Sequence, residues 1–347
     1  MRLPCALSPS CVVALTRALT CLALCACNLD NLGDPPPEGD LYLPTGMRLS
    51  QQSADSAPRF LYVINSNFDL RYNRGSVQAY DLDSLNAAVD ACANPGVGCQ
   101  IPTAPHLADE VLVPSLATSF SISPDHKRLY LATRTDPSMS FIDLDESASG
   151  EGVLACEENE RRCSDRRLRG NDANDNPRGL VLPSEPVDML TLRASDAAEG
   201  LNPETTPGTL VVVAHRGGQL SLFHDAEDGP RLLHVLTGLP LEPTGVTFDP
   251  SSHLLYLSVY ARNTFRSELP RLLARVGLSV ESSAELKTSF AYNAGAIFID
   301  GVAAQQDTRA IAVNPAKPGQ LLVASRDPAA LLFVDTERMQ SERSGTA

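Results

Sequence analysis

The chain has 347 residues, a formal net charge of −14 and no tryptophan. Such an acidic surface argues against nucleic acid as a partner, because proteins that bind phosphate backbones rely on lysine and arginine. It argues equally against electrostatic adhesion to anionic lipid. The lack of tryptophan weakens, without excluding, a role in stacking on sugars.

Residues 1–26 are expected to be an export signal. Arg2 and Arg17 lie in a stretch without acidic residues, and the apolar run 18–26 is too short to cross a bilayer as a helix. The run ends in Leu24-Cys25-Ala26-Cys27, which resembles the bacterial lipobox. The resemblance implies cleavage before Cys27 and lipidation of Cys27. A plain secretory signal with incidental cysteines is the alternative.

Residues 27–40 are expected to comprise the lipidated Cys27 and the tether that follows it. Their prolines and acidic residues cannot bury apolar surface and keep the chain extended. Removing the signal takes the net charge from −14 to −16. Asn28 in place of Asp, by resemblance to enterobacterial sorting, favours the outer membrane over the inner one. We therefore expect a lipid-anchored protein of the cell envelope, periplasmic or surface-facing, without an indication of which side.

The cysteines agree with export. Four of the nine leave with the signal and Cys27 takes the lipid, so four remain. They form two pairs with six residues between the partners: Cys92 with Cys99 and Cys156 with Cys163. In an exported protein this spacing predicts two local disulfides. One metal site built from all four is disfavoured, because the spacing exceeds that of the usual zinc knuckle.

Downstream of the tether, short apolar segments recur with a constant spacing. Three Arg–Asp pairs stand nine positions apart, and each brackets a short apolar strand: Arg134–Asp143, Arg216–Asp225 and Arg326–Asp335. Each Arg also follows an apolar strand. A fourth copy, 255–259 followed by Arg262, lacks the Asp. Self-similarity at a long period predicts a repeat architecture.

The full repeat is expected to hold four strands. The first follows a Pro-containing loop, and Pro44-Thr45-Gly46 matches Pro243-Thr244-Gly245. Fourth strands are predicted at 111–113, 180–182 and 232–236. Period-two segments without long helices indicate an all-β protein, and four-stranded units in tandem indicate a β-propeller. About five repeats are present over a propeller domain spanning 41–347.

Two segments carry a family resemblance. Tyr62-Val63-Ile64-Asn65 differs by one residue from the Tyr-Val-Thr-Asn signature of YVTN-type propeller repeats, and the segment 123–132 is similar to the core of that repeat. Related propellers include lactonase-like enzymes, quinoprotein-like domains, surface-layer proteins and lipoproteins, so the resemblance implies a fold rather than a reaction. Many members have seven blades. Because only 336–347 follow Asp335, we expect an incomplete six- or seven-bladed ring, truncated at its C-terminus, rather than a closed ring of five.

The recurring arginines are the best candidate binding site. On a blade, the turns that follow the second strands would share one face with the Pro-Thr-Gly loops. A guanidinium array there could bind carboxylate or phosphate. The candidates are Arg134, Arg216, Arg262 and Arg326. Ordinary structural ion pairs are the favoured alternative, because they are far commoner than sites.

Catalytic signals are sparse. There is no H-E-x-x-H, G-x-S-x-G, P-loop or dinucleotide motif, so we assign no catalytic residue, metal ligand or cofactor. His215, next to Arg216, is the histidine of most interest, with a turn role favoured. The first hypothesis is a membrane-anchored binding or assembly module of the cell envelope, whose partner is an envelope protein or a small anionic ligand. A lactonase-like hydrolase acting on a small anionic substrate and a structural surface protein are the alternatives.

Overall fold

The computed structural model describes residues 33–50, 57–92, 98–134, 138–147, 152–156, 161–163, 165–226, 228–239, 242–260, 271–299, 308–326 and 329–336. Contacts divide the chain into two units, Met1–Pro35 and Pro36–Ala347. All the strands belong to the second unit. Cys27 and Arg262 lie outside the described residues.

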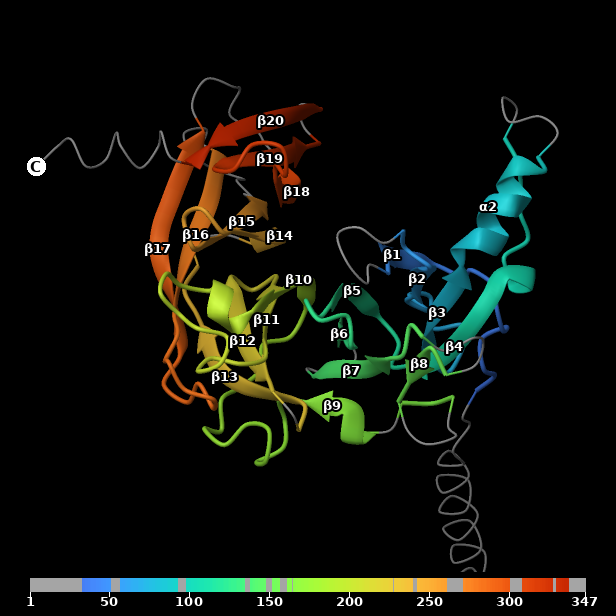
Figure 1. Cartoon of the computed structure of the whole chain (residues 1–347), viewed down its shortest axis with the longest axis horizontal. Helices are drawn as coiled ribbons and strands as arrows, with labels where there is room; N and C mark the ends of the chain where they lie inside the picture. Colours follow the sequence, from blue (N-terminus) through green and yellow to red (C-terminus); the bar gives the residue numbers. More distant parts are fainter. Residues whose placement is uncertain are drawn as a thin grey trace, which may run out of the picture. The chain divides into compact units, whose positions relative to one another are not determined.

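Five antiparallel sheets follow one another along the chain, and we number them as blades 1 to 5 (Figure 1). Blade 1 contains β1 (Pro44–Leu49), β2 (Phe60–Asn65), β3 (Gly75–Asp81) and β4 (Leu107–Val113). Blade 2 contains β5 (Ala117–Ile122), β6 (Arg128–Thr133), β7 (Met139–Leu144), β8 (Leu154–Ala155) and β9 (Leu168–Arg169). Blade 3 contains β10 (Pro186–Arg193), β11 (Thr209–His215), β12 (Gln219–Asp225) and β13 (Pro230–Leu236). Blade 4 contains β14 (Glu242–Asp249), β15 (Leu254–Tyr260), β16 (Arg271–Ser279) and β17 (Phe290–Ile299). Blade 5 contains β18 (Thr308–Val313), β19 (Gln320–Ser325) and β20 (Ala330–Asp335).

The helical segments of the described residues are short. They are α2 (Leu82–Asp90), η1 (Ala104–His106), η2 (Asp165–Arg167) and η3 (Ala194–Asp196). Within the part of the chain that the structure describes, no helix has the length and apolar character needed to cross a membrane.

The hydrophobic core lies between blades. Four buried clusters fill the four junctions between consecutive blades: 1 with 2, 2 with 3, 3 with 4, and 4 with 5. Each blade therefore buries its apolar strands against its neighbours. First strands of consecutive blades lie in contact as well, as they do around the axis of a propeller. The predicted all-β propeller, with about five blades, is confirmed.

The tyrosine of the recurring second strand links a blade to the next one. Tyr62 on β2 donates a hydrogen bond to the Glu146 carboxylate of blade 2 at 3.1 Å. Tyr130 on β6 donates to Asp225 of blade 3 at 2.5 Å. Both rings are fully buried, so each phenol needs a partner, and the next blade supplies it. This explains in physical terms why tyrosine stands in the YVTN-like motif.

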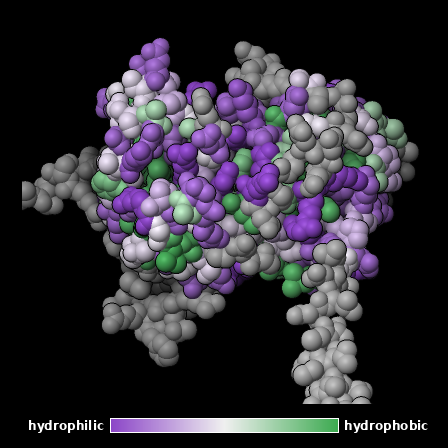
Figure 2. Space-filling view, turned by 90° about the horizontal axis from the view of Figure 1, so that it is seen from below, coloured by the Kyte–Doolittle hydropathy of each residue, from purple (hydrophilic) through white to green (hydrophobic). Residues whose placement is uncertain are grey.

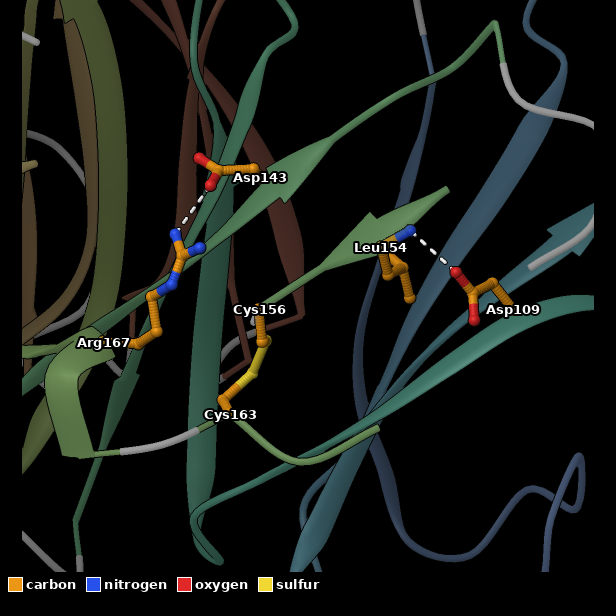
Figure 3. Close-up of a disulfide and its surroundings, with 6 residues drawn as sticks. All are labelled: Asp109, Asp143, Leu154, Cys156, Cys163 and Arg167. Carbon is orange, nitrogen blue, oxygen red and sulfur yellow. Dashed lines mark hydrogen bonds and ion pairs between the residues drawn. A yellow bond between two sulfur atoms is a disulfide. The ribbon is translucent and has the colours of Figure 1, made fainter. Parts of the chain in front are cut away.

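Blade 2 departs from the predicted four-strand pattern. Residues 180–182 are not a strand, so the prediction of a fourth strand there is wrong; two short strands, β8 and β9, pair with β7 instead. The chain between them lies along the outer edge of blade 1, where Cys163 N donates to Leu112 O at 3.0 Å. The Asp109 carboxylate on β4 accepts from the backbone N of Leu154 at 2.8 Å (Figure 3). This insertion covers an edge strand that would otherwise present unpaired backbone groups.

Both predicted disulfides are confirmed. Cys92–Cys99 has a Cα–Cα distance of 6.2 Å, and Cys156–Cys163 has one of 4.9 Å. Cys156 and Cys163 are buried in the core between blades 1 and 2, whereas Cys99 is exposed. Figure 3 shows the buried disulfide between the contact of Asp109 with Leu154 and the ion pair of Asp143 with Arg167. The buried disulfide thus fixes the insertion that joins two blades.

Replacing both Cys156 and Cys163 by Ser is expected to lower the free energy of unfolding by about 2–4 kcal/mol. The Cys92/Cys99 double Ser variant is a matched control, because both disulfides span a sequence separation of 7 residues. Their loop-closure contributions are therefore alike, and the buried pair should cost more because it also leaves hydroxyl groups in the core. Urea unfolding of the two variants measures the difference, and equal costs would contradict a role in joining the blades.

Blade 5 and blade 1 each present one uncovered face among the described residues. Phe333 on β20 is 62% exposed, although Phe141, at the same register position in blade 2, is 4% exposed. Met47 on β1 is also 62% exposed, whereas its counterpart Phe120 is 1% exposed. The equivalent positions of blade 2, Phe120 and Phe141, pack against neighbouring blades. An incomplete six- or seven-bladed ring stays a prediction.

Polar residues cover much of one face of the molecule. On the face seen in Figure 2, hydrophilic residues are spread widely and hydrophobic residues gather in small groups between them. This pattern agrees with the net charge of −14.

Candidate functional site

A β-bulge interrupts the first strand of every blade. In each case one residue is skipped in the register with the second strand, near the beginning of the first strand. The skipped residues are Thr45, Thr118, Val187, Thr244 and Arg309. A bulge re-aims the side chain that it contains, and bulges are frequent next to binding sites. The repeat thus directs one residue from each blade to a common place.

Three of these bulge residues also join consecutive blades. The hydroxyl of Thr45 donates to Ala117 O at 3.0 Å, and that of Thr118 donates to Pro186 O at 2.9 Å. Thr244 Oγ1 donates to Thr308 O at 2.7 Å. The bulge threonines of blades 1, 2 and 4 therefore tie adjacent first strands together at their N-terminal ends.

A residue with positive φ precedes the first strand in three blades. Leu43, Leu116 and Glu185 have φ angles of 49°, 61° and 54°, a left-handed conformation that costs a non-glycine residue about 1–3 kcal/mol. Each of their carbonyls accepts a backbone hydrogen bond from the residue after the second strand, as Arg134 N does with Leu116 O at 3.1 Å. The same strained loop is thus held in place in blades 1 to 3, directly beside the bulges.

The five bulge residues line one pocket of about 330 Å³. The remaining lining residues come from the loops after β2, β6 and β11 and from the start of β14: Phe68, Arg134, Arg216, Glu242 and Pro243. We call this the axial pocket, because every blade contributes a first-strand residue to it. Its size suits a small ligand rather than a macromolecule.

Arg134 is held in the axial pocket without full compensation of its charge. Its guanidinium carbon lies 5.4 Å from the centroid of the Phe68 ring, and its Nε is buried without a hydrogen-bond acceptor. Burial lowers the pKa of Arg134, and the nearby positive charge of Arg216 lowers it further. A buried donor that lacks an acceptor is costly, so an oxyanion placed there would remove an existing penalty.

Among the described residues, Arg216 has a weak ionic partner. Its Nε lies 3.9 Å from the Glu185 carboxylate, and both side chains are about half exposed. An exposed pair at this distance contributes little stability. Arg309 adds a third guanidinium to the lining, and Glu242 adds one carboxylate. The described lining is therefore positively charged within a protein that is acidic as a whole.

The structure brings together two of the four arginines identified in the sequence. Arg134 and Arg216 line the axial pocket, whereas Arg326, at the equivalent position after β19, is not among its lining residues. Arg262 lies outside the described residues, and the register places Tyr260 at the position equivalent to Arg134. Arg309 is not among the arginines identified in the sequence. An alignment of 308–310 with 44–46 and 243–245 identifies it, because Arg309 then occupies the position of the threonine in the Pro-Thr-Gly loops.

His215 is a buried residue at the end of β11. Its Nδ1 lies 3.3 Å from Ser184 O and its Nε2 lies 2.9 Å from Ser221 Oγ. Nδ1 donates to the carbonyl, which leaves Nε2 to accept from the serine hydroxyl. Burial lowers the pKa of His215 to about 4, so the imidazole is neutral at neutral pH. This arrangement agrees with the structural role expected for His215.

The protein is expected to lose stability as the pH falls from about 6.5 to about 4. His215 has its ordinary pKa of 6.5 when unfolded and a lowered pKa when folded. The unfolded chain therefore binds the proton more readily over this interval, at a cost of roughly 3 kcal/mol. Thermal unfolding of the wild type and of His215→Gln at pH 7.5 and pH 4.5 measures the effect. The variant should depend less on pH, whereas His106→Gln, at a half-buried histidine, should follow the wild type.

Metal binding has no support among the described residues, which contain no group of three or more His, Cys, Asp or Glu side chains arranged to hold a metal ion. A second pocket, of about 400 Å³, lies between blades 2 and 3 and includes Asp143 and Asp225. Arg128 bridges these two carboxylates at 2.8 and 2.6 Å. Their charges are thus used within the protein, and the axial pocket is the better candidate site.

Solved structures similar to this chain share little sequence identity with it. A putative 6-phosphogluconolactonase from Bacteroides fragilis is 11% identical at a TM-score of 0.46, over 80% of this chain and 67% of that one. A protein from Lactobacillus plantarum is 14% identical at a TM-score of 0.46, over 84% and 70% of the two chains. A putative 6-phosphogluconolactonase from Bacteroides uniformis is 12% identical at a TM-score of 0.43, over 79% and 63%. No family model and no curated protein sequence matches the chain.

Proposed function

We propose that this protein is a lipid-anchored β-propeller of the bacterial cell envelope that binds a small anionic ligand in its axial pocket. The observation that carries the proposal is the convergence of Arg134, Arg216 and Arg309 on one pocket of about 330 Å³. The YVTN-like repeats, the lipobox-like segment ending at Cys27 and the two disulfides support an exported propeller.

The electrostatics of the pocket favour an anion. Two like charges close enough for Arg216 to lower the pKa of Arg134 repel each other. An oxyanion between them would relieve the repulsion and accept hydrogen bonds from both guanidinium groups. The left-handed residues before the first strands add strain beside the same pocket, as is common where a protein pre-organises a binding site.

Binding accounts for this pocket better than lactone hydrolysis does. Hydrolysis needs a general base within reach of the substrate, usually a histidine or a carboxylate with a raised pKa. Among the described lining residues there is no histidine, and the carboxylate present is that of Glu242. His215 adjoins Arg216 in sequence, but its Nε2 is held by Ser221. A binding or assembly module is therefore the function that we propose.

Titration calorimetry with the purified protein tests ligand binding. Succinate and inorganic phosphate are the anionic probes, and succinamide is the uncharged control. We expect both anions to bind, more weakly as salt is added, and succinamide not to bind. An absence of heat with either anion at millimolar concentration, or equal binding of succinamide, would overturn the proposed ligand class.

Metabolic labelling with a fatty acid tests the anchor separately. The wild-type chain, expressed in a bacterial host, should carry the label in the membrane fraction, and Cys27→Ser should lose it. Cys92→Ser with Cys99→Ser is the control, because it removes two cysteines without touching the lipobox-like segment. Equal labelling of the Cys27→Ser variant, or none in the wild type, would contradict lipidation.

A further inference from the structure

We propose that residues 36–42 form a strap across blade 1, and that this strap holds the outer edge of blade 1 next to the membrane. The inference rests on the lipid anchor at Cys27 proposed above. It adds which side of the propeller faces the lipid surface, and it comes from contacts of the described part of the chain that are independent of the axial pocket.

The strap crosses the strands of blade 1 from the inside to the outside. Tyr42 N donates to Asn65 Oδ1 on β2 at 3.1 Å, and Asp40 O accepts from Gln78 Nε2 on β3 at 3.1 Å. Gly39 O accepts from the hydroxyl of Tyr80 at 3.0 Å. The strap therefore makes directional contacts with the second and third strands in turn, rather than lying loosely over them.

The outer end of the strap is fixed at the edge strand and the insertion of blade 2. Thr103 also donates to Gly39 O, at 2.8 Å, and Gly39 N donates to the buried Glu110 carboxylate on β4 at 3.4 Å. Glu38 forms an ion pair with Arg161 at 2.7 Å. Pro36 is buried as well. The contacts that fix the outer end of the strap thus begin at Glu38.

Gly39 is required for this path. Its φ is +73°, and a Cβ at this position would lie 3.0 Å from the Cα of Ala104 and 3.1 Å from its Cβ. Backbone at that distance cannot move aside as a flexible side chain would, so a β-branched residue here would dislodge the strap.

The strap lies on the side of blade 1 that faces away from blade 2. Gln78 and Tyr80 alternate along β3 with Val77 and Ala79, which pack into the core between blades 1 and 2. On the inner half of the same side Met47 is 62% exposed. The strap thus covers the outer half of a face that internal blades bury against a neighbour.

The length of chain between Cys27 and the strap determines which side of blade 1 can lie next to the membrane. Eleven peptide links separate Cys27 from Glu38, and they span at most about 38 Å when fully extended. If the chain were free up to Leu43, sixteen links would reach about 55 Å. A docked strap therefore shortens the reach of the tether by about a third. It keeps the strap side of blade 1 nearest to the lipid, together with η1, which lies against Gly39, and α2, which contacts η1.

The proposed approach of blade 1 to the membrane does not depend on attraction between charged groups. The side chains of α2 include Asp83 and no basic residue in the last turn, so this edge would not adhere to anionic lipid by itself. The covalent tether keeps blade 1 close to the lipid surface. The experiment should therefore change the length of tether that is free.

Single-tryptophan variants measure the orientation directly, because the native chain has no tryptophan. Val89→Trp places the donor on α2, at a site that is 53% exposed, and Tyr292→Trp places it on the outer strand of blade 4, at a site that is 45% exposed. The lipidated full-length protein is reconstituted into phosphatidylcholine vesicles that contain a dansyl-labelled phospholipid. We expect energy transfer from position 89 to exceed that from position 292 at least about twofold, given the short tether.

Releasing the strap should abolish the difference. Gly39→Val should lower transfer from position 89 towards that from position 292 and increase amide exchange over residues 39–42. If Gly39→Val fails to fold, Tyr80→Phe with Thr103→Val removes the two hydroxyl donors to Gly39 O and serves instead. A reconstituted protein without acyl groups on Cys27 would refute the proposed anchor. An acylated protein with equal transfer from both sites would overturn the strap orientation alone.

Discussion

Replacing Asp225 by Ala is expected to lower the free energy of unfolding by about 3–5 kcal/mol, the usual cost of removing one partner from a buried ion pair. The Asp225 side chain is 2% exposed and receives Arg128 Nη1 at 2.6 Å. It also accepts the hydroxyl of Tyr130 at 2.5 Å. Both donors come from blade 2 and the carboxylate from blade 3. The substitution therefore removes the acceptor of the buried Tyr130 hydroxyl and leaves Arg128 with the Asp143 half of its bridge.

Matched variants separate the contributions at this junction. Tyr130→Phe removes one hydrogen bond and should cost about 1 kcal/mol. Asp228→Ala removes an exposed carboxylate that lies 3.1 Å from Arg231, and it should change stability by less than about 1 kcal/mol. Urea unfolding at pH 7 measures all three. A cost for Asp225→Ala as small as that for Asp228→Ala would show that the ion pair between the blades contributes no net stability.

The propeller could be predicted from the sequence because its determinants are local and repeated. The second-strand motif at 62–65 is a continuous run of buried residues. The Pro-Thr-Gly loops mark where the first strands of blades 1 and 4 begin. Each repeat carries the same information, so errors in single strands did not affect the fold class. The spacing within the cysteine pairs was equally local, and both disulfides followed from it.

The strand order of blade 2 and the strap could not be predicted, because both depend on contacts between residues distant in sequence. The run 180–182 has the composition of a strand, but β7 pairs with β8 and β9, which the insertion of blade 2 supplies. Nothing in the sequence around Gly39 indicates that Gly39 packs against Ala104. Local composition describes residues 36–40 as tether, whereas the hydrogen bonds that hold Gly39 and Asp40 come from β3 and Thr103.

The arginine pattern was informative in part. The interval from Arg to Asp measures a hairpin: the Arg follows the second strand and the Asp ends the third, so the two lie at opposite ends of the blade. Arg128, outside the pattern, binds Asp143 and Asp225. These two carboxylates are therefore held by Arg128 rather than by Arg134 or Arg216. Arg309 reaches the pocket because it occupies a β-bulge. A bulge is a property of two paired strands, so one segment of sequence does not show it.

The double variant Arg134→Gln/Arg216→Gln is expected to weaken binding of succinate at least about 100-fold, because each hydrogen bond to a charged group contributes about 1.5–3 kcal/mol. The same variant should not lose thermal stability. Among the described residues, Arg134 Nε has no acceptor, and the ionic partner of Arg216 is the distant Glu185 carboxylate. Removing two repelling charges should raise the melting temperature slightly. Loss of binding with retained stability is the combination that an ordinary structural ion pair cannot produce.

Arg326→Gln is the matched control for this prediction. Arg326 holds the equivalent position after the second strand of blade 5 but is not among the residues that line the axial pocket. The control changes the net charge in the same direction, so any general electrostatic effect on anion binding appears in it as well. Succinate affinity by calorimetry should be nearly unchanged in Arg326→Gln and should fall in Arg309→Gln. If Arg326→Gln weakens binding as much as Arg134→Gln does, the ligand responds to overall charge, and the axial pocket is not where it binds.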